Sequence, residues 1–156
     1  SILRKSFHDL AKKYPPEKCD LRLFAWNSHL LSGPPLKQQE SARLWIENLR
    51  AGGGNNLRYA LEETLSLFPE VQEVFVMCDG DMKPFGDRNA TNTNFSRRTP
   101  KPSSAGEEAS GSDNWDAFVA YHRNVRFHFI ALGTRADGER MKEMAVSGRG
   151  NFTRQT

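Results

Sequence analysis

Hydrophobic residues recur along this chain at helical spacing in several stretches, and each stretch predicts an amphipathic helix. Residues 2–14 and 37–50 carry apolar side chains three and four positions apart. The same spacing runs from Leu57 to Phe68, directly after Asn56, whose side chain is suited to cap the first helical turn. Shorter helices are expected over residues 115–122, capped by Asp113, and over residues 136–146.

Between these helices lie short apolar runs that predict strands. The strongest runs are Leu21–Trp26, Val74–Cys78 and Val125–Leu132, and weaker strand patterns cover residues 28–31 and 151–155. The strong runs lack polar alternation, which is typical of strands buried on both faces. Because helices and strands alternate, we expect an α/β fold with an open, Rossmann-like sheet, mostly parallel, and helices on both faces.

Residues 82–113 break this alternation. They are rich in proline, serine, asparagine, glycine and charge, and they contain almost no apolar residues. Such a stretch cannot bury enough surface to offset the entropy lost on ordering, so we expect a mobile insert. The chain has 156 residues, which suits a single domain over residues 1–156 that contains this insert.

Charge and composition bear on three questions: nucleic-acid binding, membrane spans and the cellular compartment. The net charge of +3 is not gathered into a basic cluster, so no nucleic-acid partner is expected. No apolar run reaches the length of about 18 residues that a membrane span requires. Cys19 and Cys78 do not make a disulfide framework, and a buried free thiol at Cys78 favours an intracellular location. Glycosylation sequons at Asn89, Asn94 and Asn151 point to secretion instead, so the compartment stays open.

The predicted topology also indicates where a ligand would bind. In open α/β sheets, ligands sit at the carboxyl ends of the strands. Polar residues follow two of the predicted strands, and a glycine-asparagine loop precedes the helix that starts at Leu57. We therefore expect the binding face to contain Asn27, Gly54, Asn55, Asn56, Asp79 and Asp81.

Two stretches of the chain resemble the von Willebrand factor type A domain. The first is Ala42–Asp81, ARLWIENLRAGGGNNLRYALEETLSLFPEVQEVFVMCDGD. It is similar to the family's order of helix, Gly-Gly-Thr-Asn-Leu loop, Ala-Leu helix and apolar strand ending in Asp-Gly. The second is Val125–Phe152, VRFHFIALGTRADGERMKEMAVSGRGNF, which is similar to the family's fifth strand, last helix and lead into the final strand.

The resemblance implies a metal-ion-dependent adhesion site, at which a bound Mg²⁺ or Mn²⁺ meets an acidic side chain of a protein partner. Asp79 matches the family's third-loop aspartate, and Asn55 stands where the family has threonine. The family's Asp-x-Ser-x-Ser motif is absent, and its first strand would lie before Ser1. A domain without that central strand would have a gap between the Leu21 and Val74 strands. With one carboxylate and one amide as ligands, we expect weak or no metal binding.

The leading hypothesis is therefore a protein-interaction module of the adhesion or scaffold type, and not an enzyme. The alternative is a metal-dependent transferase. The segment VFVMCDGDMKP also resembles the Asp-x-Asp strand end of nucleotide-sugar glycosyltransferases, in which Asp79 and Asp81 would hold the metal ion. A phosphotransferase of the haloacid dehalogenase type would use the first aspartate as its nucleophile, but Lys83 replaces the residue usual there.

Overall fold

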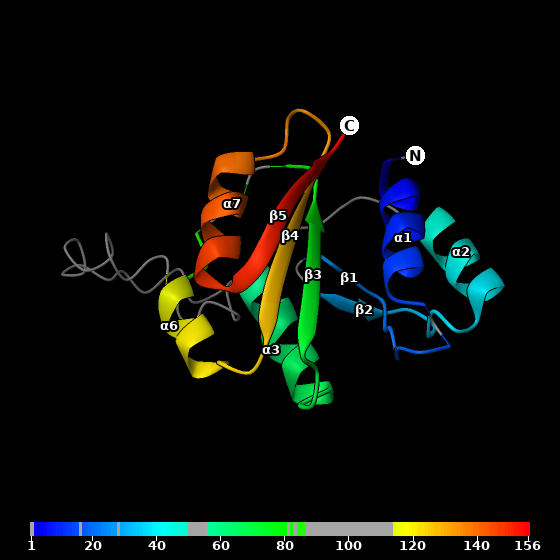
Figure 1. Ribbon diagram of the computed structural model, residues 1–156, viewed down its shortest axis with the longest axis horizontal. Coiled ribbons are helices and arrows are strands. Elements are labelled where there is room, and N and C mark those ends of the chain that lie inside the picture. Colours follow the sequence, from blue (N-terminus) through cyan, green and yellow to red (C-terminus); the bar gives the residue numbers. More distant parts are fainter. Residues whose placement is uncertain are drawn as a thin grey trace. The chain divides into compact units, whose positions relative to one another are not determined.

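The computed structural model describes residues 2–15, 17–27, 29–49, 56–80, 82, 84–86 and 114–156. Contacts within the chain divide it into two compact units, Ser1–Asn55 and Asn56–Thr156. Each unit has its own sheet, and each is described by itself (Figure 1). The expectation of one domain over the whole chain stays a prediction.

The first unit contains two helices and a β-hairpin. Helix α1 spans Ile2–Lys13 and α2 spans Gln39–Glu47, both within the predicted ranges. Strands β1 (Phe24–Trp26) and β2 (Leu30–Ser32) pair antiparallel. A small core holds these elements together, because partly buried aromatic and aliphatic side chains of the unit pack on three buried residues, Leu23, Leu36 and Ala42.

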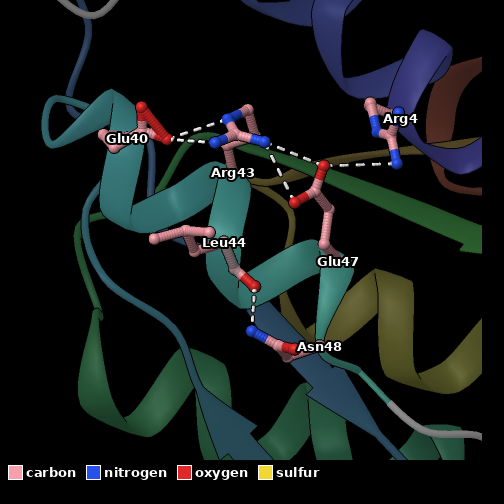
Figure 2. A network of polar contacts seen from close by, with 6 residues as sticks. All are labelled: Arg4, Glu40, Arg43, Leu44, Glu47 and Asn48. Atoms are coloured by element: carbon pink, nitrogen blue, oxygen red, sulfur yellow. Dashed lines mark hydrogen bonds and ion pairs between the residues drawn. The ribbon is translucent and has the colours of Figure 1, made fainter.

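Polar contacts on the surface of the first unit link α1 to α2 (Figure 2). Arg43 bonds both Glu40 and Glu47 on its own helix, and Arg4 of α1 reaches Glu47 across a distance of 3.3 Å. The Asn48 side chain donates to the Leu44 carbonyl at the end of α2. Since these charged groups are largely exposed, solvent screens the pairs and they contribute little to stability.

The second unit carries a parallel three-stranded sheet in the order β3-β4-β5. Its strands are β3 (Glu73–Cys78), β4 (Arg126–Leu132) and β5 (Arg149–Gln155). Helix α3 (Leu57–Leu67) precedes β3, α6 (Trp115–Tyr121) precedes β4, and α7 (Gly138–Ser147) joins β4 to β5 (Figure 1). The predicted α/β class with an open, mainly parallel sheet is confirmed.

The core of this unit is built on one face of the sheet. The indole of Trp115 packs edge-on against Phe127 and Phe129 of β4, and its Nε1–H donates to the Met144 carbonyl of α7 at 2.9 Å. The Arg58 guanidinium of α3 lies 5.7 Å from the ring centre of Phe118, on α6. These contacts bring α3, α6 and α7 together over the same face of the sheet.

The first residues of the predicted insert belong to this core. Met82 is 8 % exposed and Phe85 is 4 % exposed. The Phe85 ring lies 4.9 Å from Trp115, 4.9 Å from Phe118 and 5.0 Å from the Arg58 guanidinium, centre to centre. A boundary at residue 82 is therefore too early, because two isolated apolar residues anchor the chain after β3. Residues 87–113 lie outside the described part.

Two local details differ from the predicted helix and strand ends. The residue at the N-cap position of α6 is Asn114, in a left-handed conformation and without a side-chain cap bond, whereas the predicted cap, Asp113, lies outside the described residues. Arg149 begins β5 at φ 65°, two residues earlier than expected. Its Nη2 donates to the carbonyls of Val119, His122 and Val125, and so caps the end of α6.

Candidate functional site

Asp79 stands where the sequence places it, directly after β3 at the carboxyl end of the sheet. Its side chain is exposed. The residues before it are held in register with β4, since Met77 pairs with Ile130 and Cys78 with Ala131. A rigid strand therefore presents an exposed carboxylate at the edge where ligands bind in open α/β sheets.

The loop between β4 and α7 forms the neighbouring part of this edge. It begins at Gly133, whose φ of 86° suits glycine, and ends at Asp137, whose side chain caps α7 by accepting from the Arg140 amide. The Asp137 amide donates to the Gly80 carbonyl at 3.1 Å, which ties this loop to the end of β3. We call residues 79–80 and 133–137 the rim.

Arg154 of β5 holds the β4–α7 loop of the rim through two hydrogen bonds. Its Nη1 donates to the Gly133 carbonyl at 2.6 Å and its Nη2 to the Ala136 carbonyl at 3.3 Å. Gly138 leaves room for this guanidinium, since a Cβ at that position would collide with Arg154. The rim is therefore preorganised by a hydrogen bond between its two loops and by two hydrogen bonds from β5.

Cys78 lies beneath the rim as a half-buried free thiol. Burial raises the pKa of this thiol, and the nearby carboxylates of Asp79 and Asp137 raise it further. Both effects disfavour the thiolate, so Cys78 is poorly suited to act as a nucleophile.

The other predicted site residues lie in different parts of the chain. Asn56 caps α3, because its Oδ1 accepts from the Tyr59 amide at 3.0 Å, as the sequence predicts. Since α3 and β3 run in opposite directions and are joined by a short turn, Asn56 lies toward the end of the sheet that carries Asp79. Asn27 belongs to the first unit, where its Oδ1 accepts from the His29 amide in the turn of the hairpin. Three predicted residues, Gly54, Asn55 and Asp81, lie outside the described residues.

The described residues do not by themselves fit the ligand set of a divalent metal ion. Within residues 2–86 and 114–156, apart from the gaps stated above, no three histidine, cysteine or acidic residues are grouped so that they could hold one. Of the two rim carboxylates, that of Asp137 already caps a helix. A hard cation such as Mg²⁺ prefers about six oxygen ligands, and the rim offers few.

Sequence reasoning missed two residues that shape the rim, Asp137 and Arg154. The first could have been found, because an aspartate three residues before Arg140 at the start of an apolar stripe is a typical helix cap. The second could not, since nothing in the local pattern of β5 indicates that Arg154 reaches carbonyl groups about 20 residues earlier in the chain.

A cleft of about 550 Å³ lies at the opposite end of the sheet, where the strands begin. It is lined by residues 69–73, Asn124 and Arg126. Its charged groups are largely paired: Glu73 lies 2.6 Å from the Nε2 atom of buried His128, and 3.8 Å from Arg126. The cleft is a second candidate surface that any binding experiment has to separate from the rim.

Comparisons with known proteins agree with this geometry. The sequence profile of the von Willebrand factor type A domain matches residues 36–153. A solved structure, the von Willebrand factor type A protein from Catenulispora acidiphila, is similar in fold with a TM-score of 0.50 at 12 % identity. The match covers 87 % of this chain and 29 % of that one, so the chain spans less than a third of its length. No curated protein matches the sequence, and none of the described helices is long and apolar enough to cross a membrane.

Proposed function

Since this chain belongs to the von Willebrand factor type A domain family, we propose that it is a protein-interaction module that binds its partner at the rim. Domains of this family are generally protein-interaction modules. One observation carries the choice of surface, namely the exposed carboxylate of Asp79 on a rim whose two loops are joined by the Asp137–Gly80 hydrogen bond. The proposal assigns no catalytic residue.

The chemistry of the rim indicates the kind of group that it binds. The Asp79 carboxylate can accept hydrogen bonds in two directions, and the nearby Asp137 makes the surface more negative. An acidic side chain of the partner would need a metal ion between the carboxylates, and the described residues provide too few ligands for one. The proposal therefore pairs Asp79 directly with a hydrogen-bond donor or a cationic group of the partner.

Preorganisation favours this surface over a mobile loop. The β4–α7 loop is already bonded to Gly80 after β3 and to Arg154 of β5, so a partner would not have to order it. Binding to a rigid surface avoids the entropy cost of fixing several side chains, which is about 0.5–1.5 kcal/mol for each one.

A pair of charge reversals at the two ends of β3 tests the proposal. Asp79→Lys changes the rim, whereas Glu70→Lys makes the same chemical change at an exposed residue of the opposite cleft. Proteins captured by the wild-type chain and by each variant would be quantified by mass spectrometry, with circular dichroism as the folding control. We expect a specific partner to be retained by Glu70→Lys and lost with Asp79→Lys. Loss with Glu70→Lys alone, or retention by both variants, would overturn the proposal.

A further inference from the structure

The outer edge of β5 offers unused backbone hydrogen-bonding groups. Strand β5 is the last strand of the sheet, and two bonds fix its orientation toward β4: the Phe127 amide donates to Gly148, and the Gly133 amide donates to Gln155. In a parallel ladder the bonded residues alternate, so Thr153 and Gln155 face β4. The N–H and C=O groups of Phe152 and Arg154 consequently face away from the sheet.

This edge is only partly protected against further pairing. Proteins commonly protect an edge strand with a bulge or a charged residue. Here the register shifts between Phe127 and Phe129, opposite the beginning of β5, and it is regular from Phe152 to Gln155. The side chains of Asn151, Thr153 and Arg154 are exposed along this stretch. The second half of β5 is therefore an accessible, regular edge.

The charge of β5 indicates which kind of segment would pair with its outer edge. Strand β5 contains two arginines, Arg149 and Arg154, and no acidic residue. The contacts of both guanidinium groups are carbonyl oxygens, and in the described part of the chain neither group pairs with a carboxylate. The contacts hold the two side chains in place, and no carboxylate of the described residues forms an ion pair with either of them.

We propose that the outer edge of β5 is a docking site for an extended, acidic segment of a partner protein, which adds to the sheet as a further strand. The backbone groups of Phe152 and Arg154 would bond the added strand, and the two arginines would favour acidic side chains on it. A second copy of this chain is a poorer occupant, because two strands that each carry two arginines would oppose like charges. Arg154 also contacts the rim residues Gly133 and Ala136, but the outer backbone edge of β5 lies outside the rim residues, so the inference does not depend on the proposed function.

Amide hydrogen exchange followed by NMR tests the inference directly. The probe is a seven-residue peptide of alternating glutamate and valine with blocked ends, and the matched control replaces each glutamate with lysine. With the acidic peptide in excess, we expect slower exchange at Phe152 and Arg154, and little change at Thr153, whose amide already bonds β4. Equal protection by both peptides, protection elsewhere only, or no protection would overturn the inference.

Substitutions at Thr153 supply a second test that leaves the ladder intact. Its side chain is exposed and, because side chains alternate along a strand, lies on the opposite face from that of neighbouring Arg154, so Thr153→Glu should weaken binding of the acidic peptide and Thr153→Lys should strengthen it. One cross-strand charge pair corresponds to a change of about two- to fivefold in the dissociation constant. Identical affinities for the two variants would contradict the charge argument. Protection that rises with protein concentration in the absence of peptide would show self-pairing and would overturn the choice of partner.

Discussion

Replacing Phe85 with alanine tests whether the chain after β3 is anchored in the core. The ring is 4 % exposed and contacts Trp115, Phe118 and the Arg58 guanidinium at centre-to-centre distances of 4.9–5.0 Å. Phe85→Ala removes a buried ring and leaves a cavity between these groups. Changes of this kind cost about 3–5 kcal/mol. For a chain of this size we therefore expect the midpoint of thermal unfolding to fall by roughly 6–20 °C.

The assays are thermal unfolding and urea unfolding, both followed by circular dichroism, with Tyr121→Ala as the matched control. Tyr121 is also aromatic and lies in α6, but it is 76 % exposed, so its loss should change the free energy of unfolding by no more than about 0.5 kcal/mol. A milder variant, Phe85→Leu, should cost about 1 kcal/mol, because it keeps most of the buried volume and loses the ring contacts. If Phe85→Ala and Tyr121→Ala have the same small effect, residues 84–86 do not pack as described.

Three further predictions concern the thiol, the α6 cap and the metal. Burial raises the pKa of Cys78 above its ordinary value of 9.0, so iodoacetamide at pH 8 should alkylate it more slowly in the native chain than in urea. The thiol ionises at a lower pH in the unfolded chain than in the native chain, so Cys78 should also lower the free energy of unfolding as the pH rises above 9.0. A Cys78→Ala variant whose free energy of unfolding falls as steeply as that of the wild type over this range would contradict this prediction. Arg149→Met should lower the free energy of unfolding in urea by about 2–3 kcal/mol, because three carbonyls lose a charged donor. The control, Arg123→Met at an exposed residue, should lower it by no more than about 0.5 kcal/mol. Equal effects of the two variants would refute the cap. Excess Mg²⁺ or Mn²⁺ should not raise the unfolding temperature of the wild type more than that of Asp79→Ala, and a rise in the wild type alone would show a metal site.

The sequence was sufficient where local pattern determines structure. The apolar stripe after Asn56 predicts α3 together with its cap, and the run Val74–Cys78 predicts β3 and the position of Asp79. These elements are specified by periodicity and by hydrogen-bonding groups close in sequence. The family resemblance, which depends on the order of such elements, is confirmed by the match over residues 36–153.

Features that depend on distant contacts were not accessible from the sequence. Met82 and Phe85 are isolated apolar residues in a polar stretch, so no periodicity identifies them as core residues. The antiparallel pairing of β1 with β2 depends on which strands meet, and a local apolar run does not contain that information. The same limit applies to Arg154, whose support of the rim depends on the position of β5 beside β4. Whether Asp79 and Asn55 converge stays a prediction, because Asn55 lies outside the described residues.

The most direct measurement for the central claim is site-specific photo-crosslinking to the partner in cells. A benzophenone amino acid would replace exposed Thr134 of the rim in one variant, which keeps Asp79, and Glu70 in the cleft at the other end of β3 in a second variant. We predict a discrete cross-linked partner from position 134 and none from position 70. A cross-linked partner from position 70 alone, or the same partner with equal yield from both positions, would contradict binding at the rim.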